Sequence, residues 1–213
     1  MHHVTMYLDF VSPYAWLAFQ QLPQALQGLN CRVEYRPALL GALLQMNNNT
    51  APASIPGKRA WIYRHTQWLG QHLGVPLQMP ATHPFNPLPL LRLSLQTSED
   101  GSVNRYVAET IFRHVWESGA EALDSERLQA LEQQLSQQLQ ASPQREDNAK
   151  KWLRSNTDRA AAAGLFGLPA FEAGEQIFWG LDSLPMLRDF LQGNPWFQKQ
   201  GGENANPVSA GLA

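Results

Sequence analysis

Segments with the residue pattern of β-strands occur only near the two ends of this chain, and the stretch between them has helical periodicity. Residues 4–10 are rich in β-branched and aromatic side chains, and residues 31–36 alternate in polarity, so both are predicted to be strands. Residues 14–26 between them have apolar side chains at helical spacing. A strand, a helix and a second strand in this order favour a βαβ unit whose two strands run parallel.

The central part of the chain, residues 38–160, is predicted to be entirely helical apart from its loops. Apolar residues recur at helical spacing in residues 57–73, 102–117 and 124–140. Five prolines fall within residues 74–89, which are therefore predicted to form an irregular loop.

Strand character returns after this helical part. Residues 168–173 and 175–179 are predicted to pair as a hairpin around Gly174. A closing helix is predicted over residues 183–191, with Asp182 as its N-cap.

This order of elements predicts an α/β chain with a thioredoxin-like fold and a large all-helical insertion. We expect the thioredoxin-like domain to comprise residues 1–37 and 161–192, and the inserted helical domain to comprise residues 38–160. Residues 193–213 hold few apolar side chains and are predicted to be a poorly ordered tail. The length of 213 residues suits one domain with an insertion better than several independent domains.

Composition excludes several classes of function. The 16 Lys and Arg against 18 Asp and Glu give a net charge of −2, without the basic excess of a nucleic-acid-binding protein. The single cysteine excludes an intramolecular disulfide and a dithiol redox centre within one chain. No apolar stretch is long enough to span a membrane and the N-terminus lacks a signal-peptide pattern, so we expect a cytoplasmic protein without a membrane partner.

Common catalytic motifs are also missing from the sequence. The six histidines are scattered and no pair has the spacing of a helical metal site, so no metal is expected. The sequence contains no GxSxG nucleophile motif, no GxGxxG motif and no P-loop.

Ser12 stands where the first predicted strand gives way to the first helix, and Pro13 suits the first helical position. The free N–H groups and the dipole of a helix N-terminus favour an anion, including a thiolate. A serine cannot supply a thiolate, but it can donate a hydrogen bond to a thiolate that a ligand brings. The residue pattern equally allows Ser12 to be a plain N-cap, which is the commoner role.

Three further segments could contact a ligand, and each also has an ordinary structural interpretation. A cis peptide bond before Pro169 would present the backbone of Leu168 to an extended peptide, although a trans proline at a strand start is more frequent. Asp182 could bind an ammonium group or simply cap its helix. The side-chain amides of residues 47–49 could bind a ligand or form a turn.

Taken together, these segments resemble the 2-hydroxychromene-2-carboxylate isomerase family, which shares a superfamily with kappa-class glutathione transferases and DsbA-like disulfide oxidoreductases. The resemblance extends from about residue 4 to residue 191. It is carried by DFVSPYAWLA (9–18), RPALLGALLQMNNN (36–49), HPFNPLPLLR (83–92), IFRHVW (111–116) and GLFGLPAFEAGEQIFWGLD (164–182).

The resemblance implies that glutathione is the cofactor and that Ser12 is the catalytic residue that stabilises its thiolate. It implies further contacts with glutathione from the backbone of Leu168 before Pro169, from Leu181 and Asp182 at the γ-glutamyl end, and from Asn49. Asn49 and Asn86 are implied to contact the substrate, and relatives of this kind are often homodimers.

The implied reaction is the glutathione-dependent isomerisation of an unsaturated aromatic keto acid of the 2-hydroxychromene-2-carboxylate type. The alternatives are a kappa-like glutathione transferase and a non-catalytic thioredoxin-like binding protein. The chain departs from the family pattern at Gln45, where a lysine is usual, and at Leu181, where many members have asparagine.

Overall fold

The computed structural model describes residues 1–200, which fold around a four-stranded mixed sheet with the strand order β2-β1-β3-β4. The strands are β1 (His2–Leu8), β2 (Cys31–Pro37), β3 (Ala170–Ala173) and β4 (Gln176–Trp179). β1 runs parallel to β2 and antiparallel to β3, and β3 runs antiparallel to β4. The predicted parallel pair and the predicted hairpin are therefore both confirmed.

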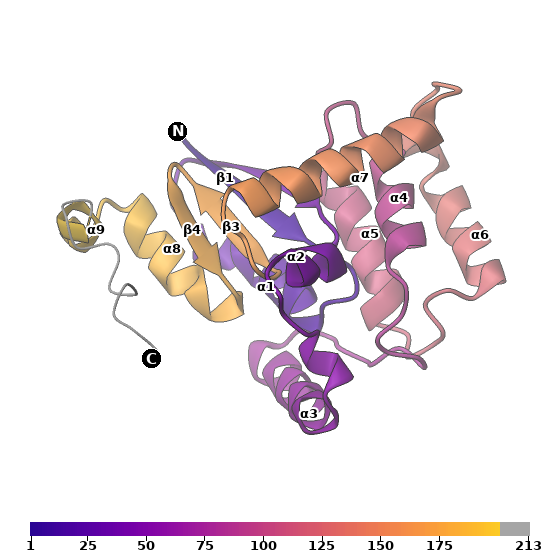
Figure 1. Ribbon diagram of the computed structural model, residues 1–213, viewed down its shortest axis with the longest axis horizontal. Helices are drawn as coiled ribbons and strands as arrows, with labels where there is room; N and C mark the ends of the chain where they lie inside the picture. Colours follow the sequence, from indigo (N-terminus) through magenta and orange to yellow (C-terminus); the bar gives the residue numbers. More distant parts are fainter. Residues whose placement is uncertain (201–213) are drawn as a thin grey trace.

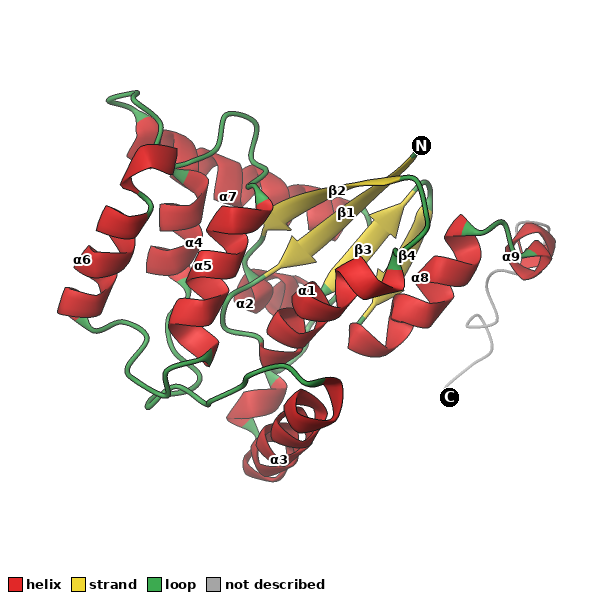
Figure 2. Cartoon of the chain, turned by 180° about the vertical axis from the view of Figure 1, so that it is seen from behind, coloured by secondary structure: helices red, strands yellow, loops and turns green. Residues whose placement is uncertain are grey.

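Helices cover both faces of this sheet, as the predicted thioredoxin-like fold requires. The α-helices are α1 (Pro13–Ala25), α2 (Leu40–Met46), α3 (Pro56–Leu73), α4 (Leu88–Leu95), α5 (Arg105–Trp116), α6 (Ser125–Gln134), α7 (Arg145–Ala162), α8 (Leu184–Leu191) and α9 (Pro195–Gln200). The short 3-10 helices are η1 (Pro52–Ser54), η2 (Ser136–Gln138) and η3 (Leu181–Ser183). α7 lies in front of the sheet in Figure 1, and α1 and α8 lie over the opposite face in Figure 2.

The helix α1 begins as the sequence predicts, with Ser12 at the N-cap and Pro13 at the first helical position. Pro23 lies inside this helix and has no backbone N–H, so it cannot bond to the carbonyl of Phe19 one turn earlier. Arg105 of α5 donates to that carbonyl at 3.4 Å, and its guanidinium lies 4.2 Å from the centroid of the Phe19 ring. The contact with α5 thus satisfies the carbonyl that the proline leaves free.

One hydrophobic core joins the sheet, α1 and the helices α4 and α5. The Phe112 ring of α5 lies 4.9 Å from the ring centroid of Phe10 and 5.2 Å from that of Phe19. α3 contributes little to this core, because only Thr66 and Gly70 of its residues are buried. It lies at the bottom of Figure 1, where it contacts α1 through the hydrogen bond between Tyr14 and His65.

Two sequence predictions about element ends are wrong. Strand β1 ends at Leu8, because the chain turns at Asp9 to enter α1. The helix predicted over residues 124–140 ends at Gln134 and continues only as the short 3-10 helix η2.

The prediction that Asp182 caps the last helix of the sheet domain is also wrong. Asp182 lies within η3, and the residue at the N-cap position of α8 is Ser183, whose side chain makes no cap hydrogen bond. The hydroxyl of Ser183 instead donates to the carbonyl of Gly180 at 2.8 Å. The tight 3-10 turn therefore leaves the Asp182 carboxylate exposed at the surface.

The predicted poorly ordered tail is helical over its first part. α9 begins after Asn194, whose side chain accepts a hydrogen bond from the N–H of Trp196 at 3.0 Å. The Phe197 ring lies 5.2 Å from that of Phe190 and 6.1 Å from that of Phe178, so this turn is packed against α8 and β4. The rest of the predicted tail, residues 201–213, lies outside the described residues.

Candidate functional site

A cavity of about 1250 Å³ lies among the N-terminus of α1, the start of α2, helix α3 and the turn after β4. It is lined by six of the seven residues that the sequence singles out: Ser12, Asn49, Leu168, Pro169, Leu181 and Asp182. These six come from segments far apart in the chain. The fold therefore brings them to one place, as the resemblance implies.

Ser12 is 6% exposed and lies at the cavity wall. Its Oγ accepts a hydrogen bond from the N–H of Ala15 at 3.2 Å, so it does cap α1. The same hydroxyl donates to the carbonyl of Leu168 at 3.4 Å, a long and therefore weak bond. The N-cap interpretation and the ligand-binding interpretation are compatible, because the cap uses an oxygen lone pair and leaves the hydroxyl proton available to another acceptor.

The peptide bond between Leu168 and Pro169 is cis, the less frequent of the two forms that the sequence leaves open. Within residues 1–200 the N–H of Leu168 donates no hydrogen bond, while its carbonyl accepts only the weak bond from Ser12. Pro169 accepts a hydrogen bond from the N–H of Gly180 at 2.9 Å. This bond ties the turn after β4 to the cis-proline segment.

The turn after β4 presents two further unpaired donors. Gly180 has φ 91°, a conformation that suits glycine, and it leads directly into η3. Among the described residues, the N–H groups of Leu181 and Asp182 have no acceptor. The beginning of η3 therefore offers two free N–H groups beside an exposed carboxylate, a combination that suits a group carrying both a negative and a positive charge.

Asn86 is the one predicted residue that does not line the cavity. It is exposed, and its side-chain oxygen accepts a hydrogen bond from the N–H of Leu88 at 3.1 Å, at the start of α4. Its neighbours Phe85 and Pro87 do line the cavity. The segment is thus near the site, while the amide of Asn86 itself is engaged in a local turn.

Several cavity residues that the sequence does not single out belong to α3. Lys58 lines the cavity and provides an exposed cation. His65 accepts or donates a hydrogen bond at Nδ1 with the hydroxyl of Tyr14 at 2.9 Å, and the Trp61 ring stacks on its imidazole. The sequence holds one indication that these residues belong together: positions 58, 61 and 65 are three and four residues apart, which places their side chains on one face of a helix.

The cavity wall also carries exposed aromatic rings. Trp61 and Trp179 are 55% and 54% exposed, and the Phe166 and Trp179 ring centroids lie 4.9 Å apart. Such exposed rings suit a flat apolar ligand.

Burial shifts the pKa of several groups around the site. Asp9 is fully buried and pairs with no cationic side chain among residues 1–200, so desolvation raises the pKa of its carboxyl to about 7, against the opposing effect of backbone N–H groups. Burial, and secondarily the charge of Asp182, raises the pKa of the Tyr14 hydroxyl. Burial lowers the pKa of the His83 imidazole.

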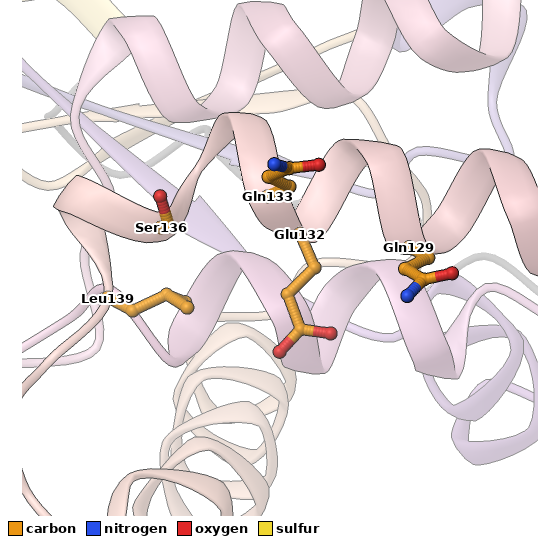
Figure 3. A pocket seen from close by; sticks show the side chains of 5 residues that line it. All are labelled: Gln129, Glu132, Gln133, Ser136 and Leu139. Atoms are coloured by element: carbon orange, nitrogen blue, oxygen red, sulfur yellow. The ribbon is translucent and has the colours of Figure 1, made fainter.

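A second, smaller hollow of about 400 Å³ lies on the surface of α6 and the turn that follows it. Figure 3 shows its side chains: Gln129, Glu132, Gln133, Ser136 and Leu139. None of the seven predicted site residues lines it, and it holds one acidic group without a neighbouring nucleophile or base. It is a surface groove with no evident chemistry.

No cluster of three or more His, Cys, Asp and Glu side chains in residues 1–200 is arranged to hold a metal ion. In the same part of the chain, no helix combines the length and the apolar character that are needed to cross a membrane.

Comparison with known proteins places this geometry in context. The model of the DSBA-like thioredoxin domain family matches residues 3–192. The chain is 23% identical over 193 residues to 2-hydroxychromene-2-carboxylate isomerase of Sphingobium xenophagum, covering 88% of this chain and 97% of that protein. It is 25% identical over 206 residues to glutathione S-transferase kappa 1 of Rattus norvegicus, covering 90% and 91% of the two chains.

The solved structures agree with the sequence comparisons. A structure of 2-hydroxychromene-2-carboxylate isomerase superposes with a TM-score of 0.71 at 22% identity, covering 94% of this chain and 99% of that one. At this level of identity the likeness establishes the fold. The predicted thioredoxin-like fold and the predicted family resemblance are both confirmed.

Proposed function

The chain belongs to the family of DSBA-like thioredoxin domains, and from this membership we propose that it is a glutathione-dependent isomerase of unsaturated aromatic keto acids. The family includes disulfide oxidoreductases, but here Ser12 and Ala15 stand where a dithiol centre needs two cysteines. The only thiol of the chain, Cys31, lies in β2 and does not line the cavity. A thiol for chemistry at this site therefore has to come from a ligand.

The observation that carries the proposal is the position of the Ser12 hydroxyl beside the backbone of Leu168, whose carbonyl accepts only the weak bond from Ser12 and whose N–H has no acceptor among residues 1–200. An extended peptide beside Leu168 can donate an N–H to its carbonyl and accept from its N–H, as a strand does in a sheet. A cysteinyl residue in that position would have its sulfur near Ser12. The hydroxyl proton of Ser12 can turn to the sulfur because its present bond to Leu168 is weak.

The remaining groups of the cavity match the remaining groups of glutathione. The γ-glutamyl end carries a carboxylate and an ammonium group, which the N–H groups of η3 and the carboxylate of Asp182 can bind. The glycyl end carries a second carboxylate, for which Lys58 offers a cation and Asn49 an amide. Gln45, where relatives usually have lysine, is exposed outside the cavity lining, so its lost charge does not remove the cation of the cavity.

When bound, glutathione would supply a thiolate able to add to an electron-poor carbon, so that a double bond becomes a single bond that can rotate, and elimination of the thiolate would restore the double bond and free glutathione. Ser12 stabilises the negative sulfur by donating its proton, and the N-terminus of α1 adds a favourable dipole. The aromatic wall formed by Trp61, Phe166 and Trp179 stacks on the rings of the substrate and excludes water. The chain itself thus orients the reactants and stabilises charge.

A kappa-like glutathione transferase is the second candidate. It is supported by the similarity to glutathione S-transferase kappa 1 and by a cavity large enough for glutathione and a second molecule. The two activities differ in the fate of the thiol, which an isomerase returns and a transferase consumes.

The test is to incubate the protein with an unsaturated aromatic keto acid, with and without glutathione, and to follow isomer and free thiol together. The proposal predicts isomerisation that requires glutathione while the free thiol stays constant. Loss of free thiol in step with product would support the transferase. Isomerisation that proceeds equally without glutathione would refute the proposal.

A further inference from the structure

The segment that leads into Ser12 is held by one of its own side chains and by two side chains from distant parts of the chain. The indole N–H of Trp116 on α5 donates to the carbonyl of Phe10 at 3.0 Å. The carboxylate of Asp9 accepts from the N–H of Val11 at 3.1 Å. The imidazole Nε2 of His83 lies 2.8 Å from the carbonyl of Val11.

As a result, each of the two peptide units before Ser12 is bonded at both ends. In the unit between Phe10 and Val11, the carbonyl is bonded to Trp116 and the N–H to the side chain of Asp9. In the unit between Val11 and Ser12, the carbonyl is bonded to His83, and the N–H donates to the backbone carbonyl of Asp9 at 3.2 Å. A loop would normally leave such groups to water. We call Asp9, Trp116 and His83 the Val11 clamp.

The clamp also reaches the opposite wall of the cavity. The second carboxylate oxygen of Asp9 accepts from the N–H of Leu40 at 2.9 Å, at the start of α2. Leu40 and Val11 both line the cavity. Asp9 therefore fixes the spacing between the Ser12 loop and the helix that leads to the asparagine loop.

We propose that the Val11 clamp is a positioning device for the Ser12 hydroxyl, so that Asp9, Trp116 and His83 act on catalysis through the backbone before Ser12. This rests on the proposed function of Ser12. Asp9 and Trp116 do not line the cavity, whereas the His83 side of the clamp reaches its wall. A hydroxyl that is already oriented stabilises a thiolate without paying an ordering cost at the moment of reaction. Buried positions support the role, because Asp9 and Trp116 are both inaccessible to solvent.

The chemistry of His83 fixes its tautomer. A carbonyl oxygen can only accept, so Nε2 of His83 carries a proton. The Tyr63 hydroxyl lies 2.8 Å from Nδ1 and 2.8 Å from the carbonyl oxygen of His83, so in the neutral ring its single proton serves both acceptors. Burial lowers the pKa of His83, and the charge of Arg59 on the same helix as Tyr63 lowers it further. Among the described residues, Asp9 is paired with no cationic side chain. The clamp therefore works with a neutral imidazole at neutral pH.

The chain offers a matched control for His83. His114 is also partly buried, donates from Nε2 to a backbone carbonyl, that of Ala122, at 2.9 Å, and also has a pKa lowered by burial. It does not line the cavity. His83→Leu and His114→Leu thus remove the same kind of bond, inside and outside the proposed device, and His83→Gln restores a side-chain N–H donor.

The experiment measures glutathione-dependent turnover, glutathione affinity and the amide hydrogen exchange of Val11 and Ser12 in these variants. The expected result for His83→Leu is a turnover number about 10- to 100-fold lower with an affinity within about twofold of the wild type, and about tenfold faster exchange of the two amides. His83→Gln should recover most of both effects, and His114→Leu should show neither. If His83→Leu behaves like His114→Leu, or keeps wild-type exchange, the positioning role is refuted.

The exchange measurement needs no glutathione, so it separates this proposal from the proposed function. A wild type without glutathione-dependent turnover would refute the function, while unchanged exchange in His83→Leu would refute the clamp. If His83→Leu does not fold, Tyr63→Phe removes the hydroxyl that contacts Nδ1 and the carbonyl of His83 and leaves the imidazole in place, and faster exchange of Val11 and Ser12 is then the expected result. Wild-type exchange in Tyr63→Phe would then refute the clamp.

Discussion

Replacing Ser12 by alanine should raise the pKa of the thiol of bound glutathione. The hydroxyl lies at the N-cap of α1, and among residues 1–200 its proton is held only by the weak bond to Leu168. A hydrogen bond to a charged group contributes about 1.5 to 3 kcal/mol. Since one pKa unit corresponds to about 1.4 kcal/mol, the loss should raise the thiol pKa by roughly 1 to 2 units.

The assay is a pH titration of the ultraviolet absorbance of the thiolate in the complex, compared with the same titration of free glutathione. In the wild type the pKa of the bound thiol should lie below that of free glutathione. In Ser12→Ala it should move back towards the free value, and turnover near neutral pH should fall by about tenfold or more because the thiolate population falls.

Stability has to be separated from this effect, because Ser12 also caps α1 through the N–H of Ala15. Loss of an N-cap costs about 1 kcal/mol. Asn104 caps α5 in the same way, accepting from the N–H of Val107 at 2.9 Å outside the cavity. Asn104→Ala should therefore lose similar stability without moving the thiol pKa. If Ser12→Ala leaves the thiol pKa unchanged, the role of the hydroxyl as a thiolate donor is wrong.

Three further predictions follow from the geometry. Burial raises the pKa of Asp9 to about 7 in the folded chain, whereas the unfolded chain loses this proton near the ordinary pKa of an aspartate, so the free energy of unfolding should fall by up to about 4 kcal/mol as the pH rises from the ordinary pKa to about 7. Urea unfolding of the wild type and of Asp9→Asn at both of these pH values measures this fall, which only the wild type should show. An equal pH dependence of the unfolding free energy in the two proteins would contradict the prediction. Lys58→Gln should weaken glutathione binding about threefold to tenfold, with a smaller loss at high salt, measured by calorimetry; a loss that is independent of salt would argue against a carboxylate partner. Gly180→Ala should destabilise the protein by more than about 1 kcal/mol and weaken glutathione binding, because φ is 91° and the new Cβ would lie about 2.5 Å from Oδ1 of Asp182. The control is Gly28→Ala, where φ is similar but the space around the new Cβ is open, and it should leave the glutathione affinity unchanged.

The strands and the site residues close to them could be predicted from the sequence because their signals are local. Ser12 and Pro13 follow a β-branched strand directly, and a hairpin around Gly174 needs only short-range turn chemistry. The resemblance then placed Leu168, Leu181 and Asn49 in one cavity, since a family motif carries information about distant contacts that periodicity lacks.

The missed features depend on tertiary contacts. Nothing near Lys58 in the sequence indicates that α3 faces the cis-proline segment, because that depends on the path of the loops around it. The bonds of Trp116 and His83 to the Ser12 loop join positions about 70 to 100 residues apart, and no local pattern reports such a pairing. The capping role expected for Asp182 failed for a related reason: a cap residue and a residue in a 3-10 turn have the same sequence preference, and the backbone angles decide between them.

The central claim is that the cavity binds glutathione as a thiolate beside Ser12, and a calorimetric titration with glutathione and with S-methylglutathione tests it most directly. The account predicts that the free thiol binds about 10-fold or more tightly than the methylated form, because only the thiol can ionise and accept the hydrogen bond of Ser12. It also predicts that a proton is released on binding of the free thiol near neutral pH, seen as a dependence of the binding enthalpy on the buffer. Equal affinity for the two ligands without proton release would contradict a thiolate site at Ser12.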